Sequence, residues 1–158
     1  MGNSIPQGAL TRNMVWMKGY NMRLTYTDNL IQVEGLTHFD LAETLDCGQC
    51  FRFVPAGDSW RGFAGGRAAV LSMQGDALCI EQKAGPAGET AGSGFWVDYL
   101  DLERDYEEIW QAFQRDFCRG SENGGLLRCM AYAPGIRVLH QPAWEALVAF
   151  IISQNNNV

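Results

Sequence analysis

The segment Cys-Gly-Gln-Cys-Phe-Arg-Phe at 47–53 contains residue types that suit recognition of a planar polar ligand. Gly48 has no Cβ, so its carbonyl oxygen can approach a ligand closely. Gln49 offers both donor and acceptor atoms. On a strand, Phe51 and the phenylalanine two residues on share one face, and Arg52 points to the other. Composition alone also fits a plain strand that enters the core after a glycine turn, and that alternative stays open.

The cysteines at 47 and 50 have the Cys-x-x-Cys spacing of metal and redox sites. A structural zinc site needs a second pair of ligands, and the sequence offers only two histidines, His38 and His140. We therefore expect no metal and treat both histidines as structural. Five cysteines without a secretory signal or a long apolar run indicate reduced thiols in a cytoplasmic protein that is not secreted, nucleoid-associated if prokaryotic.

Three consecutive asparagines, Asn155, Asn156 and Asn157, follow an apolar stretch that ends at Ile151-Ile152. Asparagine side chains compete with the backbone for hydrogen bonds, so a polar helix end explains them without any function. Because the apolar stretch has little chain after it, the sequence also resembles one cut through a larger fold. An apolar helix left unpacked favours self-association.

Short runs with tight turns predict an antiparallel meander between residues 22 and 100. Residues 23–33 read as a hairpin, and Gly65-Gly66 suits a two-residue hairpin loop. The other expected segments are a short helix or wound connection within 36–45, strands at 50–54, 60–64, 67–73 and 77–82, and an extended piece at 95–100. Residues 1–21 show no period and predict a poorly ordered leader.

Beyond residue 101 the apolar period becomes helical, which predicts about three helices within 101–158. The first carries an aromatic stripe that we expect to be core, and the third begins after Pro142. Acidic residues near the first helix are expected to be solvated or capping groups. The stripe is Tyr106, Trp110, Phe113 and Phe117, and the acidic residues are Asp98, Asp101, Asp105, Glu107 and Glu108. The fold class is α+β.

From about Met22 to Val158, the order of elements and the two motifs resemble the 8-oxoguanine DNA glycosylase family. The resemblance implies a twisted sheet of the TATA-binding-protein type. It assigns base recognition to Gly48, Gln49 and Phe51, with the Gly48 carbonyl accepting the N7–H that 8-oxoguanine has and guanine lacks. Arg52 is expected to be structural.

In that family the first of the three asparagines enters the gap left by the extruded base and contacts the orphaned cytosine. The resemblance gives that role to Asn155, and Asn156 and Asn157 are expected to support the turn. An enzyme that works on a base in duplex DNA takes it out of the stack, and a short amide suits the vacancy.

The family's helix-hairpin-helix, its nucleophilic lysine and its aspartate follow the asparagine segment, and nothing in 1–158 matches them. Lys18 and Lys83 are the only lysines, and neither sits in a similar segment. The resemblance therefore predicts the N-terminal part of a base-excision-repair glycosylase and abasic-site lyase. The helical part, 101–158, would be cut off before the catalytic region, so the chain alone would be inactive. No cofactor is expected.

A net charge of −6 and a pI near 4.8 argue against strong DNA binding by this chain alone. The expected partner of the complete protein is double-stranded DNA containing 8-oxoguanine, with no membrane, and the complete protein is expected to be a monomer. Three alternatives remain: a non-catalytic module that binds protein or damaged DNA through the sheet, a glycosylase with another base preference, and an incomplete gene product.

Overall fold

The computed structural model describes residues 13–16, 22–27, 29–82, 94–117 and 124–155. Within them the chain forms one antiparallel sheet and five helices, which confirms the α+β class. The strands are β1 Asn13–Trp16, β2 Arg23–Tyr26, β3 Leu30–Glu34, β4 Phe53–Ala56, β5 Ser59–Ala64, β6 Arg67–Gln74 and β7 Ala77–Gln82. The helices are α1 Leu41–Leu45, α2 Gly94–Tyr99, α3 Tyr106–Phe117, α4 Gly124–Tyr132 and α5 Ala143–Asn155.

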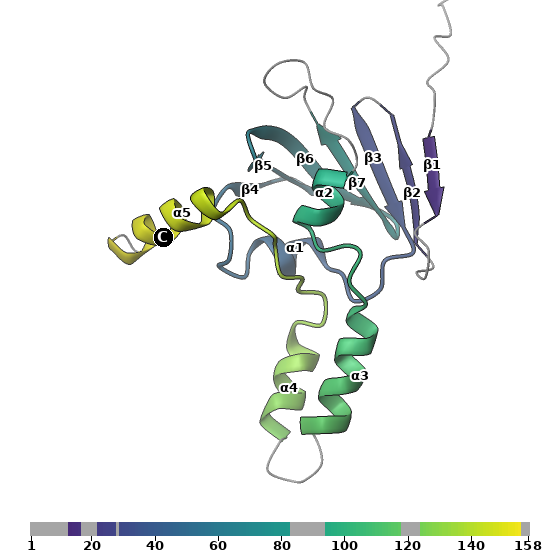
Figure 1. Ribbon diagram of the computed structural model, residues 1–158, viewed down its shortest axis with the longest axis vertical. Coiled ribbons are helices and arrows are strands. Elements are labelled where there is room, and N and C mark those ends of the chain that lie inside the picture. The colour runs from purple at the N-terminus through teal and green to yellow at the C-terminus, as the bar shows by residue number, and fades with distance from the viewer. Residues whose placement is uncertain (1–12, 17–21, 28, 83–93, 118–123, 156–158) are drawn as a thin grey trace, which may run out of the picture.

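The sheet consists of two meanders joined side by side, in the order β1-β2-β3-β7-β6-β5-β4 (Figure 1). The first runs from β1 to β3 and the second from β4 to β7, and β3 pairs with β7 to join them. Gly65 and Gly66 have φ of +55° and +73°, the left-handed conformation that a tight turn between β5 and β6 requires. This hairpin and the strands predicted within 23–33 and at 60–64, 67–73 and 77–82 are therefore present. The strand predicted at 50–54 begins only at Phe53, because the chain bends at Phe51 and Arg52, so Phe51 does not share a strand face with Phe53.

One face of the sheet carries the core, and α1 and α2 pack on it. Trp96 of α2 is fully buried, and its ring meets those of Phe53 and Tyr99 edge-on. Its indole nitrogen donates to Gln82 Oε1 at 2.8 Å, so the polar atom of this large side chain is satisfied inside the core.

Beyond α2 the chain leaves the sheet, and α3 and α4 project from it side by side while α5 extends from the β4 side (Figure 1). Asp105 caps α3 by accepting from the Glu108 backbone N–H at 2.9 Å, as predicted. The aromatic stripe of α3 is core only at its start. Tyr106 is buried, Trp110 is half-buried and Phe113 is 39% exposed.

Two expectations about elements are wrong. Residues 95–100, expected to be extended, form most of α2, because Trp96, Val97 and Leu100 are all buried and a strand would turn alternate side chains away. β1 lies inside 1–21, where a loose leader was expected, and pairs with β2 along four residues. Its short length explains why no period is visible. The rest of 1–21 lies outside the described residues.

Candidate functional site

The loop that carries Gly48 lies between α1 and β4, and the chain bends at each residue from Asp46 to Gln49. Gly48 has φ of +85°, and a Cβ built there would meet no atom within 4 Å. Any larger residue would be strained by this backbone conformation rather than by crowding. The main chain at Gly48 is therefore exposed beside open space, as a carbonyl that receives a ligand would need to be.

The side chain of Gln49 fixes this loop against the segment that precedes α5. Its Nε2 donates to the carbonyl oxygens of Thr44 at 2.9 Å and Arg137 at 2.7 Å, and its Oε1 accepts from the Leu139 N–H at 2.9 Å. Gln141 donates to the Gln49 backbone carbonyl. The side-chain amide thus pairs with backbone groups, as the backbone of an adjacent strand would. The expected base-recognition atoms of Gln49 are used inside the fold, so the structure gives this side chain a positioning role.

The segment from Gly135 to Leu139 is itself held against α1. The Gly135 N–H donates to Glu43 Oε2 at 2.7 Å, and the Thr44 hydroxyl donates to the Gly135 carbonyl at 3.0 Å. A Cβ at Gly135 would lie 2.4 Å from the Asp40 backbone nitrogen, so only glycine permits this approach. Residues about 90 positions apart in sequence thereby form one rigid support for the Gly48 loop.

Arg137 is the buried anchor of that support, and the sequence reading missed it. Its guanidinium donates to the carbonyls of Thr37 at 2.6 Å, Asp101 at 2.9 Å and Arg104 at 3.3 Å, and stacks over the Tyr106 ring at 4.3 Å. Burial lowers the pKa of Arg137 from its ordinary value. An arginine inside a short apolar run was the available signal, because an arginine at a buried position needs partners.

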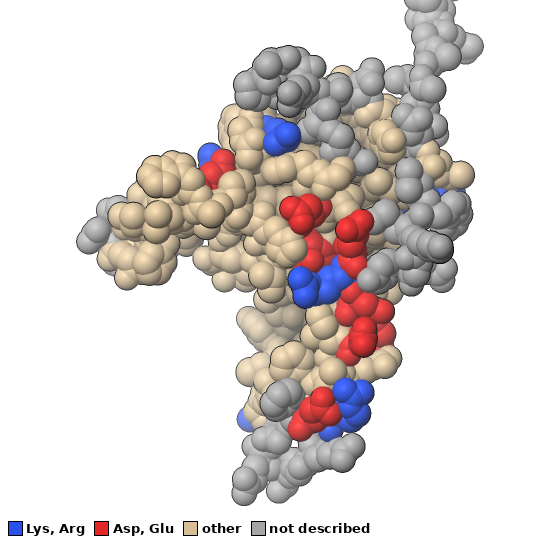
Figure 2. Space-filling model, in the orientation of Figure 1, with Lys and Arg blue, Asp and Glu red and all other residues tan. Residues whose placement is uncertain are grey.

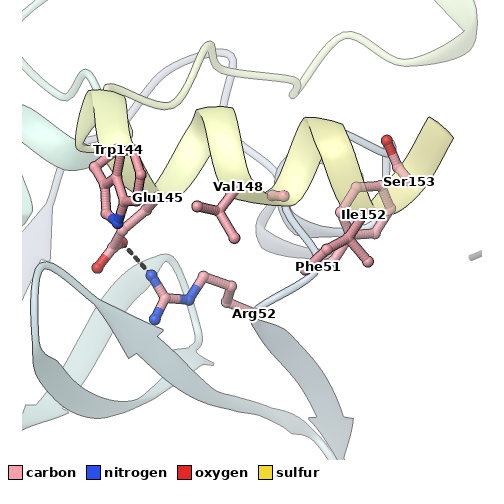
Figure 3. Close-up of a pocket in the computed structure, with 8 residues that line it drawn as sticks. Phe51, Arg52, Trp144, Glu145, Val148, Ile152 and Ser153 are labelled. Carbon is pink, nitrogen blue, oxygen red and sulfur yellow. Dashed lines mark ion pairs between the residues drawn. The ribbon is translucent and has the colours of Figure 1, made fainter. Parts of the chain in front are cut away.

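A groove of about 370 Å³ lies between the residues just before β4 and α5. Phe51 and Arg52 form one side, and Trp144, Val148, Ile152 and Ser153 of α5 face them (Figure 3). Glu145 of α5 makes an ion pair with Arg52 and accepts from the Gly65 N–H at 3.2 Å. Arg52, for which a structural role was expected, thus links the start of β4 to the first turn of α5 through Glu145.

Of the residues that the sequence singled out for base recognition, only Phe51 lines the groove, and the α5 residues that face it include Ile152 and Ser153, close to Asn155. Phe51 is 41% exposed and lies across from Ile152, near the end of α5. Asn155 is the last residue of α5, so its backbone continues the helix that forms the far wall. Asn156 and Asn157 lie outside the described residues. Trp144, Val148, Ala149 and Ile152 make most of the remaining lining apolar, which suits the face of a planar ring more than a phosphate.

Both histidines bind carboxylates, and one of those carboxylates is buried. His140 lies 3.0 Å from Asp98 Oδ1 and 3.5 Å from Asp101 Oδ1. Asp101 is 6% exposed and also accepts from Arg104 and from the Tyr106 hydroxyl. The expectation that Asp101 is solvated or capping is wrong, because its tight turn at φ +50° directs it into this network.

Burial and the hydrogen bond to Asp101 raise the pKa of Tyr106, although the bond that its hydroxyl accepts from the Val138 N–H opposes the rise. Burial also raises the pKa of Tyr99, helped by its contact with Cys50. Both phenols therefore stay neutral at ordinary pH and act as hydrogen-bonding supports rather than as bases.

Within the described residues, no group of three or more histidine, cysteine, aspartate or glutamate side chains is placed to hold a metal ion. None of the helices in that part of the chain is long and apolar enough to cross a membrane. A second, wider groove of about 990 Å³ lies on the outer face of the sheet, over Arg61, Phe63, Val70 and Glu81. It contains none of the residues that the sequence singled out.

The sequence matches the family described as 8-oxoguanine DNA glycosylase, N-terminal domain, over residues 32–147. The N-glycosylase/DNA lyase OGG1 of Arabidopsis thaliana is 30% identical over 130 residues, which make up 78% of this chain and 33% of that protein. A solved structure of MBOgg1 in complex with a low-affinity DNA ligand superimposes with a TM-score of 0.72 at 34% identity. That match covers 86% of this chain and 44% of the other.

The 8-oxoguanine glycosylase/lyase of Clostridium acetobutylicum, in complex with double-stranded DNA containing cytosine opposite 8-oxoguanine, superimposes with a TM-score of 0.70 at 30% identity. The match covers 84% of this chain and 42% of that enzyme. The chain thus spans a third of the curated relative and less than half of the solved structures. The chain belongs to the 8-oxoguanine DNA glycosylase family and corresponds to its N-terminal domain.

Proposed function

We propose that this chain is the N-terminal part of a repair enzyme that recognises 8-oxoguanine in double-stranded DNA, excises it and nicks the abasic site. Residues 22–100 would supply the sheet part and residues 101–158 the beginning of the helical part. The observation that carries the proposal is the groove, because Phe51, three residues after the exposed main chain of Gly48, faces the end of α5 across one largely apolar space.

Gly48 would identify the damaged base. The N7–H of 8-oxoguanine can donate to a carbonyl, whereas N7 of guanine presents a lone pair and leaves the acceptor unsatisfied. An unsatisfied buried acceptor costs about 1–3 kcal/mol, which is enough to discriminate strongly. The hydrogen bonds that the Gln49 side chain makes to Thr44, Arg137 and Leu139, here called the Gln49 clamp, support this role. A carbonyl recognises one atom only if its position is fixed.

Phe51 and Asn155 would complete this half of the site. The Phe51 ring, 41% exposed on the groove, would pack against the extruded base. Asn155, at the end of α5, would enter the vacated space in the duplex, and its amide can both donate to and accept from the orphaned cytosine. Asn156 and Asn157 would support the turn that follows.

The chain by itself would be inactive. Schiff-base lyase chemistry needs a lysine nucleophile beside the base pocket. Lys18 and Lys83 lie outside the described residues, and no other lysine exists in the chain. In this proposal the nucleophile and its aspartate belong to the part of the relatives that this chain does not span.

The surface charge also indicates that other parts of the protein would make most of the contacts to the DNA phosphates. Acidic side chains gather along the junction of α2 and α3 (Figure 2). The exposed members are Asp98, Glu103, Asp105, Glu107 and Glu108. Phosphates would avoid this face, since like charges repel. The same face favours the second candidate, a module that binds a basic protein partner instead of DNA.

A matched pair of glycine variants tests the proposal. The chain would be joined to the C-terminal part of the Clostridium acetobutylicum enzyme, and excision of 8-oxoguanine opposite cytosine compared with excision of guanine. Gly48→Ala should lower the 8-oxoguanine preference by about tenfold or more, the order expected for one misplaced acceptor. Gly57→Ala is the control, because Gly57 also has a positive φ, +65°, and open space around it.

Equal losses in both variants would mean that backbone strain alone is responsible, and would count against base recognition by Gly48. Incision by the unjoined 158-residue chain would refute the inactivity. Binding of a basic protein, with no effect of either variant on an active chimera, would favour the interaction module.

A further inference from the structure

The proposed function leaves two thiols unexplained at the ends of the Gly48 loop. Cys47 is exposed, whereas Cys50 is 5% exposed with its sulfur 3.5 Å from the Tyr99 hydroxyl. One thiol is therefore open to solvent and the other faces the core, with only Gly48 and Gln49 between them.

The surroundings of Cys47 are polar. Its sulfur lies 3.2 Å from Gln49 Nε2 and 3.4 Å from the Thr44 carbonyl. Gln49 Nε2 has two hydrogens and three acceptors within reach, so donation to a Cys47 thiolate, the form that attacks disulfides, competes with its bonds to the Thr44 and Arg137 carbonyls. The amide that holds the loop thus also contacts the exposed sulfur, so a chemical change at Cys47 acts directly on the clamp.

We propose that Cys47 and Cys50 form an oxidation-sensitive pair that closes to a disulfide and opens the Gln49 clamp. The Cys47 thiolate attacks a small-molecule disulfide such as oxidised glutathione, forms a mixed disulfide and releases one glutathione thiolate. Cys50, losing its proton, then attacks the Cys47 sulfur and expels the second glutathione. The two protein thiols are oxidised, and one glutathione disulfide is reduced to two thiols.

The loop combines a short separation of the two cysteines with a restraint on their approach. Its chain bends at each residue from Asp46 to Gln49, and a disulfide requires Cα atoms about 4.4–6.8 Å apart. Closing it takes the Cys50 sulfur away from Tyr99 and into the loop. The clamp must open for that movement, so the disulfide is strained relative to the reduced loop, and strained disulfides are readily reduced again.

The consequence for base recognition rests on the proposed function, but the disulfide chemistry does not. If the Gly48 carbonyl accepts a hydrogen bond from N7–H, a disulfide between Cys47 and Cys50 moves that carbonyl. The preference for 8-oxoguanine then falls while oxidant is present. The pair would then connect the recognition loop to the redox state of the cell.

The experiment uses the 158-residue chain with Cys118→Ser, because Cys118 lies outside the described residues. The chain is incubated with oxidised glutathione, alkylated and mapped by peptide mass spectrometry. The expected product is a 47–50 peptide that has lost two hydrogen atoms and resists alkylation. Cys129, an exposed thiol on α4, is the internal control and should stop at a mixed disulfide.

Two single variants define the order of attack. Cys50→Ala should leave Cys47 as a lasting mixed disulfide, and Cys47→Ser should leave Cys50 unmodified. Thermal unfolding of each variant verifies that it is folded. A lasting mixed disulfide on Cys47 in the chain with both cysteines, or no reaction at Cys47 while Cys129 reacts, would overturn the proposal.

Gln49→Ala measures the restraint. Removing the clamp should speed disulfide formation by about tenfold, the order expected when hydrogen bonds no longer oppose opening. An unchanged rate would show that the clamp does not govern the pair. In the chimera, a disulfide that forms without changing base preference would count against Gly48 recognition and leave the cysteine chemistry intact.

Discussion

The sheet with α1 and α2 buries most of its large apolar side chains, whereas the helix α5 exposes most of its own. Leu71, Leu78 and Trp96 of the sheet region are fully buried. On α5, Trp144 is 74% exposed and Phe150 59%. The sheet region buries a core of its own, whereas α5 presents apolar side chains that the described residues leave exposed.

Polar contacts join the sheet region to the segment that leads into α5 and to the start of that helix. Glu145 reaches Arg52 and the Gly65 N–H, and Gln141 reaches the Gln49 carbonyl. All of these contacts lie at or before the first turn of α5. These polar contacts hold the start of the helix, and the apolar side chains Val148 and Ile152 nearer its end face Phe51 across the groove.

The largest effect should come from the sheet core. Trp96→Ala removes a fully buried ring and leaves the Gln82 acceptor without its indole partner, so the free energy of unfolding should fall by about 3–5 kcal/mol. Leu147→Ala on α5, where Leu147 is 49% exposed, should change it by about 0.5 kcal/mol or less. Urea denaturation followed by fluorescence measures both.

The α5 surface should instead govern association. We expect the chain to self-associate through these exposed side chains, and Leu147→Ser with Ile151→Ser should reduce the sedimentation coefficient at a given concentration. A large loss of stability in the α5 variants would break the contrast between the two regions, as would a monomeric unsubstituted chain.

Arg137 should give the next largest effect, since it joins the two parts. Arg137→Met leaves the carbonyls of Thr37 and Asp101 without their donor, and the free energy of unfolding should fall by about 1–3 kcal/mol. Arg115→Met is the matched control, because Arg115 is an exposed residue of α3 paired with Asp116. Equal melting temperatures for the two variants would contradict the anchoring role.

The sequence predicts this molecule best where the pattern is local. The alternating residues in 67–73 and the Gly65-Gly66 pair are sufficient to predict β6 and the turn before it. Asp105 likewise indicates where α3 begins. Arg137 and Gln49 each make hydrogen bonds to residues about 90 positions or more away in the sequence. No local pattern in the sequence indicates such contacts. α2 was missed because a six-residue helix shows fewer than two turns of its period.

Glu145 tests the link between the regions. Glu145→Gln removes the ion pair with Arg52, and amide hydrogen exchange in α5 should become faster by about two- to fivefold, the range of a partly exposed ion pair. The sheet amides should keep their protection. Glu103→Gln, an exposed acidic residue between α2 and α3, is the control. Faster exchange throughout the sheet would show that the two regions unfold together.

The smallest effect should be a pH dependence at the base of α3. His38 Nε2 lies 2.6 Å from Glu107 Oε2, and its ring stacks on Trp110 with centroids 5.1 Å apart. The hydrogen bond from His38 lowers the pKa of Glu107 below its ordinary value. A carboxylate with a depressed folded-state pKa stabilises the fold above the unfolded pKa, about 4.3, and loses that stabilisation as pH falls through the folded value.

Glu107→Gln removes that titration, so its melting temperature should lie slightly below that of the unsubstituted chain at pH 6 and converge with it in acid. Because both side chains are partly exposed and screened by water, the difference should be smaller than any of those above. Glu108→Gln, on the neighbouring exposed residue, should leave the acid profile unchanged. Melting curves between pH 3 and pH 6 decide the matter. A difference that persists or grows in acid would mean that α3 is held by the His38–Trp110 stack and not by the carboxylate.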